Sequence, residues 1–127
     1  MKNRIFTGAA SETLAGYAKA VIDGTTIHVS GTTGRDPLTN LFPEDPGQQA
    51  RNALASIQAT LREAGSSLAD VIVSRVYVSD LEAATAVTPV LGEVFADIRP
   101  TSTFLICQIP APGARVEIEI TASRSIA

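Results

Sequence analysis

The sequence predicts an α+β fold in which two helices cover one face of a sheet. Two stretches have the apolar spacing of amphipathic helices, and strand-like stretches flank and separate them in the order β-β-α-β-α-β-β. The last of these strands alternates apolar residues with Glu117 and Glu119, which gives the sheet a polar face. Because two helices cover only one face, we expect other subunits to complete the open one.

A hairpin opens the predicted fold. Residues 17–22 have the composition of a strand, Asp23-Gly24 is a strong two-residue turn signal, and residues 25–31 form the returning strand. Alternation gives the returning strand two faces, with Ile27 and Val29 on one and Thr26, His28 and Ser30 on the other.

The first helix is predicted from residue 45 to residue 65. Asp45 suits the N-cap and Pro46 the first helical position, while Gln48 stands where a capping box would place it. Gly65 is expected at the C′ position that ends the helix. One apolar stripe runs along this helix, made of Ala50, Ala53, Leu54, Ile57, Leu61 and Ala64.

The second half of the chain contains a strand, a helix and two further strands. Residues 71–78 are β-branched and nearly all apolar, which predicts a central strand covered on both faces. Helical spacing extends from Leu81 to Phe95 and includes Pro89, which would either kink the helix or start a second piece. The remaining strands are expected over residues 103–109 and 115–122.

Composition favours one soluble, globular domain over residues 1–127. Apolar residues make up 45% of the chain and charged residues 18%, whereas disordered chains combine low hydrophobicity with high charge. The net charge of −3 and the scattered basic residues argue against a nucleic-acid partner. One cysteine and one histidine give neither an internal disulfide nor a structural zinc site. We therefore expect no metal, no cofactor, no membrane segment and a cytoplasmic location.

Four segments together resemble the reactive intermediate deaminase (Rid, or YjgF) family. They are Gly16-Tyr17, Val29-Ser30-Gly31, the helix 45–65 with its Gln-Ala-Arg-Asn-Ala-Leu core, and residues 116–122. The resemblance covers nearly the whole chain in order. It implies a chorismate-mutase-like homotrimer with a small-molecule cleft between each pair of subunits. It also implies a role in metabolite damage control, through hydrolysis of imines and enamines such as 2-iminopropanoate.

The resemblance also assigns site residues. Glu117 matches the glutamate that orients or activates the attacking water, which makes it the expected catalytic residue. Tyr17, Ser30 and Gly31 match residues that line the cleft. In the family, an arginine in a Pro-x-Arg-Ser segment grips the substrate carboxylate, a task that suits the bidentate guanidinium.

Three further cleft positions depart from the family pattern. Ser102 occupies the arginine position, Phe104 stands where a cysteine is frequent, and Thr88 replaces an asparagine. Loss of the arginine would weaken carboxylate binding by roughly ten- to a hundred-fold. The chain thus resembles the branches of the family that lack this arginine.

Three hydroxyl side chains lie at and beside the position at which the family has its arginine. Thr101, Ser102 and Thr103 suit a neutral polar group of the substrate. Arg99, three residues before Ser102, and Arg35, in an earlier loop, are the two cationic alternatives. The leading hypothesis is hydrolytic deamination of a small imine, enamine or related carbonyl compound in a cleft between subunits.

Other interpretations stay open. A trimer of the same fold that binds a metabolite or a partner protein without catalysis is the alternative, and the acidic balance counts against a ribonuclease. Glu117 also fits the solvated face of an alternating strand, and Tyr17 and Ser30 also fit structural roles. His28 is expected in packing or a subunit contact, and Cys107 is expected to be buried.

Overall fold

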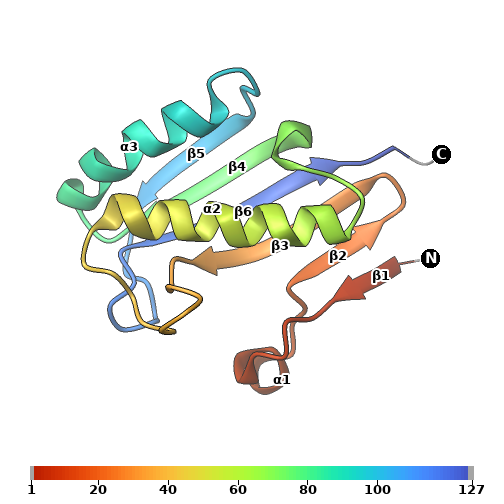
Figure 1. The fold of residues 1–127 in the computed structure, drawn as a ribbon, viewed down its shortest axis with the longest axis horizontal. Coiled ribbons are helices and arrows are strands. Elements are labelled where there is room, and N and C mark those ends of the chain that lie inside the picture. Colours follow the sequence, from red (N-terminus) through yellow and green to blue (C-terminus); the bar gives the residue numbers. More distant parts are fainter. Residues whose placement is uncertain (1, 126–127) are drawn as a thin grey trace.

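A six-stranded sheet with the strand order β1-β2-β3-β6-β4-β5 forms one layer of the structure, a computed structural model that describes residues 2–125. Helices α2 and α3 pack together on one face of this sheet (Figure 1), so the predicted α+β fold is confirmed. β4 and β5 are parallel, and the other neighbouring strands are antiparallel. The strands are β1 (Lys2–Ile5), β2 (Ala20–Asp23), β3 (Thr26–Thr33), β4 (Val71–Val78), β5 (Thr101–Ile106) and β6 (Val116–Ser123). The helices are α1 (Ala10–Ala15), α2 (Pro46–Glu63) and α3 (Leu81–Phe95), with a short 3-10 turn η1 (Leu68–Asp70) before β4.

Two N-terminal elements, β1 and α1, were missing from the predicted order, which was therefore incomplete. β1 has no apolar alternation and buries no side chain fully, because backbone pairing with β2 is what holds it in the sheet. The predicted strand over residues 17–22 was wrong at its start. α1 ends before Gly16, and β2 begins only at Ala20, so residues 17–19 connect the two.

The hairpin of β2 and β3 confirms the predicted turn at Asp23-Gly24. β3 extends to Thr33, beyond the predicted end at Gly31. Its two faces are as expected, because Ile27 and Val29 are buried beneath the helices while Thr26 and Ser30 are half-buried and His28 is exposed.

Helix α2 follows the prediction closely. The Asp45 side chain accepts a hydrogen bond from the backbone N–H of Gly47 at 3.0 Å, as an N-cap does. The capping box was wrong, because the Gln48 amide donates to Asn52 on the next turn instead of reaching back. Gly65 has a φ of 82°, which suits the C′ position. The predicted stripe is buried along its whole length, at Ala50, Ala53, Leu54, Ile57, Leu61 and Ala64.

Helix α3 spans the predicted residues and continues through Pro89 as one helix. Beneath it, β4 is a central strand between β6 and β5, as predicted. The expectation that β4 is covered on both faces was wrong for the chain alone. Val76 and Val78 are fully buried under the helices, but on the opposite face Arg75 is exposed and Tyr77 is only half-buried. No described part of this chain covers that face.

β5 lies at the edge of the sheet, and this position accounts for the exposure of its end. The strand begins two residues before the predicted residue 103 and ends at Ile106. As an edge strand it leaves Leu105 and Ile106 about half exposed. Cys107 follows the end of the strand and is exposed, so the expectation that this thiol is buried was wrong.

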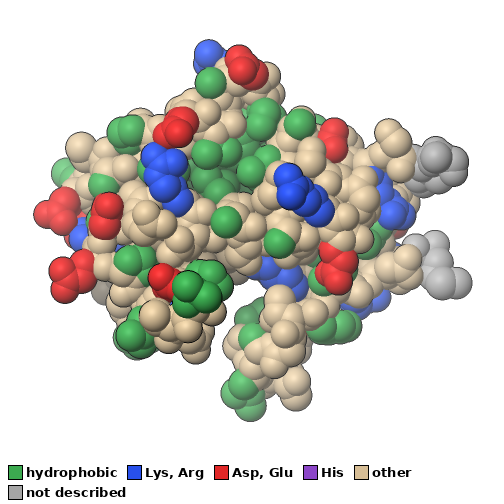
Figure 2. All heavy atoms as spheres, viewed as in Figure 1, with side chains coloured by type: hydrophobic (Ala, Val, Ile, Leu, Met, Phe, Trp, Pro, Cys, Tyr) green, Lys and Arg blue, Asp and Glu red, His purple; other side chains and the backbone are tan. Residues whose placement is uncertain are grey.

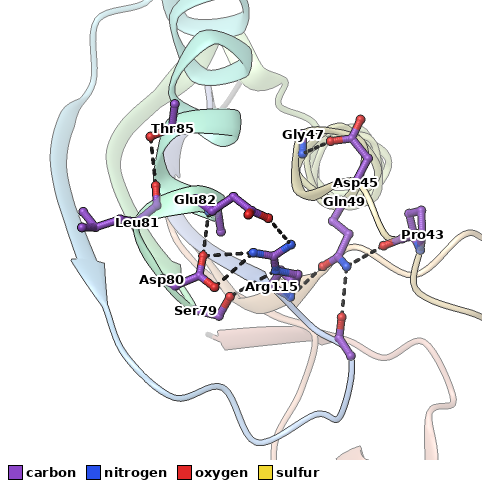
Figure 3. A network of polar contacts seen from close by, with 12 residues as sticks. Pro43, Asp45, Gly47, Gln49, Ser79, Asp80, Leu81, Glu82, Thr85 and Arg115 are labelled. Atoms are coloured by element: carbon purple, nitrogen blue, oxygen red, sulfur yellow. Dashed lines mark hydrogen bonds and ion pairs between the residues drawn. The ribbon is translucent and has the colours of Figure 1, made fainter.

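A polar network ties α2 to the loop before β6 (Figure 3). Gln49 is fully buried, and its amide group donates to the carbonyls of Pro43 and Gly113. The Gln49 side-chain oxygen accepts from the backbone N–H of Arg115 at 2.8 Å. The Arg115 guanidinium then pairs with two carboxylates around the start of α3, those of Asp80 and Glu82.

Candidate functional site

Two of the predicted cleft residues form a β-bulge in β3. Val29 pairs with Ile120 and Thr32 pairs with Ile118, so β3 holds one residue more than β6 between these two pairs. The irregularity falls at Ser30-Gly31. Such bulges bend a strand and redirect its side chains, and they are over-represented beside active sites.

The carboxylate of Glu117, on β6, lies against this bulge. Its Oε2 is 2.9 Å from the position that a Cβ on Gly31 would take, so the glycine leaves room for the carboxylate. The side chain is half-buried. Burial, together with the nearby Glu119 carboxylate, raises the pKa of Glu117 above its ordinary value, and no hydrogen bond from the described residues counteracts this.

Ser30 connects the bulge to the segment that carries Tyr17. The Ser30 hydroxyl donates to the carbonyl of Ala18 at 2.6 Å, so this hydroxyl has a structural role. The Tyr17 hydroxyl lies 2.6 Å from the Ser11 hydroxyl of α1, and the Tyr17 side chain is 42% exposed. We call Tyr17, Ser30, Gly31 and Glu117 the bulge cluster.

A separate cavity of about 440 Å³ lies between α3 and β5. Four residues that the sequence singled out line it together: Thr88, Arg99, Ser102 and Phe104. We call it the α3–β5 cavity. Its other lining residues are Ser74, Leu91, Gly92, Phe95, Ala96 and Pro100.

Ser74 belongs to this cavity and was missed by sequence reasoning. The residue is 3% exposed, and it pairs with Ser102 across β4 and β5. Its hydroxyl makes no hydrogen bond to the described residues and is open to the cavity rather than sealed in the core. Such a hydroxyl needs water or a ligand as its partner. The available signal was a serine in phase with the buried Val76 and Val78 of an apolar strand.

The bulge cluster and the α3–β5 cavity lie on opposite faces of the sheet. Ser102 shares the helix-covered face with buried Ser74, whereas Glu117 lies between the buried Val116 and Ile118 and so faces the other way. Thr101 and Thr103 alternate with Ser102 and do not line the cavity. The Thr101 hydroxyl donates to the carbonyl of Ile72. One chain therefore does not bring its own Glu117 to its own cavity.

The two alternative arginines differ in position. Arg99 lines the α3–β5 cavity at an exposed place, and its Nε donates to the carbonyl of Ala96 at 2.7 Å. Its backbone has a φ of 55°, a left-handed conformation that is uncommon for a residue other than glycine. Arg35 lies over the ring of Phe42 and donates to the carbonyl of Asn40, and it does not line the cavity.

The surface shows neither a region of one charge on the face seen in Figure 2 nor a cluster of metal ligands among the described residues. Figure 2 shows acidic and basic side chains interspersed over the helix-bearing face, with hydrophobic side chains between α2 and α3. Within residues 2–125, no group of three or more His, Cys, Asp or Glu residues is placed to hold a metal ion. No helix in the described part of the chain is long and apolar enough to cross a membrane.

Similar proteins match this chain over nearly its whole length. Residues 7–124 match the family model described as Endoribonuclease L-PSP. Rv2704 of Mycobacterium tuberculosis, a member of the YjgF/YER057c/UK114 family, is 35% identical with a TM-score of 0.86, over 97% of this chain and 99% of that one. NMB1025 of Neisseria meningitidis, from the YjgF family, is 26% identical with a TM-score of 0.84, over 100% and 98%. YyfA of Yersinia pestis, a protein of unknown function from the Rid family, is 25% identical with a TM-score of 0.83, over 97% and 99%.

Proposed function

The chain belongs to the endoribonuclease L-PSP family, also called the YjgF/YER057c/UK114 family, and we propose that it hydrolyses a small reactive imine, enamine or related carbonyl compound. In this reaction, water adds to the carbon of a C=N bond. The carbinolamine that forms then expels ammonia and leaves a carbonyl group.

Glu117 is the residue that carries this proposal. A half-buried carboxylate with a raised pKa is a stronger base than an ordinary glutamate, and it holds and deprotonates a water molecule more effectively. The bulge at Gly31 leaves room for the carboxylate at this place. In the proposed reaction, Glu117 orients the attacking water and accepts its proton as the C–O bond forms.

We propose that the complete site lies between subunits of a homotrimer. The α3–β5 cavity offers a lined space for the substrate, but Glu117 of the same chain lies on the other face of the sheet. A neighbouring subunit that contributes its bulge cluster to this cavity would combine the two parts. The half-exposed Ile72, Leu105 and Ile106 are apolar surface that such a contact would bury.

Ammonia release from freshly generated 2-iminopropanoate and from uncharged imines, with and without the protein, tests this function. We expect Glu117→Gln to lower kcat on an active substrate by roughly a hundred-fold or more, because the amide cannot accept the proton. Glu119→Gln is the comparison variant: this carboxylate accepts a hydrogen bond from Tyr77 and acts on Glu117 only through its charge, so its removal should lower kcat far less. Unchanged turnover in Glu117→Gln on every active substrate would disprove the mechanism.

A second candidate function is binding without catalysis. It is favoured by the lining of the α3–β5 cavity, where Ser102 leaves no charge at the position of the family arginine. A protein that binds a small molecule in this cavity but accelerates no imine hydrolysis would support this alternative.

A further inference from the structure

Gly92 is an unexpected residue at its place in α3. It lies inside the last turn of the helix, three residues before Phe95, where alanine would be a better helix former. No packing contact explains it, because a Cβ built on Gly92 meets no atom within 4 Å. Gly92 instead lines the α3–β5 cavity, so the missing side chain enlarges that cavity.

The rest of the cavity lining combines apolar side chains with one free hydroxyl. Leu91, Phe95 and Phe104 supply apolar surface. Ser74 is 3% exposed and its hydroxyl opens onto this space without a partner among residues 2–125. A ligand that fits these walls therefore has an apolar group and one polar atom able to bond the Ser74 hydroxyl.

The cavity offers little stabilisation to an ionised group at this hydroxyl. No carboxylate lines the cavity, and Arg99 is the one charged lining residue in the described chain. The Arg99 side chain is exposed, and its Nε is held by the carbonyl of Ala96 at the end of α3. An anion beside the buried Ser74 would lose its water, and an exposed guanidinium screened by solvent would compensate for little of that loss.

We propose that the α3–β5 cavity selects an uncharged carbonyl compound, or its imine, that carries a branched apolar side group. Gly92 admits the apolar group, and the Ser74 hydroxyl donates a hydrogen bond to the carbonyl oxygen or imine nitrogen. This inference rests on the proposed function, because it names the substrate class of the same site. Both residues are specificity-determining residues, and neither takes part in the proton transfer.

Binding of three small probes to the whole protein tests this inference. Methyl isobutyl ketone has the apolar group and the carbonyl, acetone lacks the apolar group, and α-ketoisocaproate carries a carboxylate in place of the ketone's methyl group. We expect the ketone to shift the backbone amide resonances of Ser74, Gly92 and Phe104 in NMR titrations. Acetone and α-ketoisocaproate should each bind at least about tenfold more weakly, since one loses apolar contact and the other brings a charge.

Three variants locate the binding. Gly92→Leu should fold, because nothing occupies the space around its Cβ, and it should weaken ketone binding at least about tenfold by filling the cavity. Thr85→Leu places the same side chain on an exposed part of α3 outside the cavity and should leave binding unchanged. Ser74→Ala should unfold at the same denaturant concentration as the wild type, yet bind the ketone several-fold more weakly.

Several results would overturn the inference. They are tighter binding of α-ketoisocaproate than of the ketone, shifts confined to residues outside the cavity, and equal losses in Gly92→Leu and Thr85→Leu. Binding is measured without turnover, so its failure is separate from failure of the proposed hydrolysis. If the probes do not bind but Glu117 still controls ammonia release, only the substrate class is wrong.

Discussion

The carboxylate of Glu117 occupies the space that a side chain on Gly31 would need, because a Cβ on Gly31 would lie 2.9 Å from Oε2. We expect Gly31→Ala to push the carboxylate away from the bulge. Because the clash is with the end of a flexible side chain, the free energy of unfolding should change by less than about 1 kcal/mol. Turnover should fall at least about tenfold, since small misplacements of a catalytic group are costly.

Steady-state kinetics and urea unfolding of Gly31→Ala check this prediction. The same substitution in a Glu117→Gln background is the control, because the two changes act on one carboxylate and should not be additive. If Gly31→Ala lowers turnover equally in both backgrounds, the contact with Glu117 is not the cause.

The raised pKa of Glu117 predicts how its removal affects stability. A carboxyl group whose pKa is higher in the folded state binds its proton more tightly there. Its contribution to stability therefore falls as the pH rises from the ordinary pKa to the raised one. Glu117→Gln should therefore have a higher free energy of unfolding than the wild type at about pH 7. The difference should shrink when the pH is lowered below the ordinary value of 4.5. Denaturant unfolding across this range measures it, and a variant less stable at neutral pH would contradict the prediction.

The buried amide of Gln49 predicts a large loss of stability on substitution. Gln49→Leu keeps the volume but leaves two carbonyls and the backbone N–H of Arg115 without their partner. We expect a loss of about 3 kcal/mol in the free energy of unfolding, measured in urea. Gln48→Leu is the matched control, because Gln48 is exposed and bonds only Asn52, and it should change stability by less than about 0.5 kcal/mol.

Lys19 predicts a rise in stability at alkaline pH. Burial lowers the pKa of its amine from 10.5 to about 8, although the Glu12 carboxylate acts in the opposite direction. Between these two pKa values, the Lys19 amine keeps its proton in the unfolded chain but loses it in the folded protein. The free energy of unfolding should therefore rise by up to about 3 kcal/mol as the pH increases.

Substitution of Lys19 isolates this contribution. Lys19→Met should remove the alkaline rise, whereas Lys2→Met, at an exposed lysine of β1, should keep it. Chemical unfolding at several pH values between 8 and 10.5 measures both variants against the wild type. An equal rise in Lys19→Met and wild type would show that other groups produce it.

The limits of sequence reasoning follow from the kind of contact involved. Helices α2 and α3 were predicted well because burial of one apolar stripe sets their periodicity. β1 was missed because its sequence alone does not reveal the backbone pairing with β2. Ser74 and Gly92 were missed for a related reason, since only the packing of α3 beside β5 turns a small residue into part of a cavity wall.

The position of Ser102 predicts a gain of carboxylate binding. Ser102→Arg places a guanidinium among the residues that line the α3–β5 cavity. A charge-assisted, bidentate pair should strengthen the binding of a carboxylate-bearing probe such as α-ketoisocaproate by roughly ten- to a hundred-fold. Thr101→Arg is the matched control, because alternation along β5 directs that side chain away from the cavity. Calorimetric titration of both variants distinguishes a specific pair in the cavity from general attraction by an added positive charge, which would strengthen binding equally in the two.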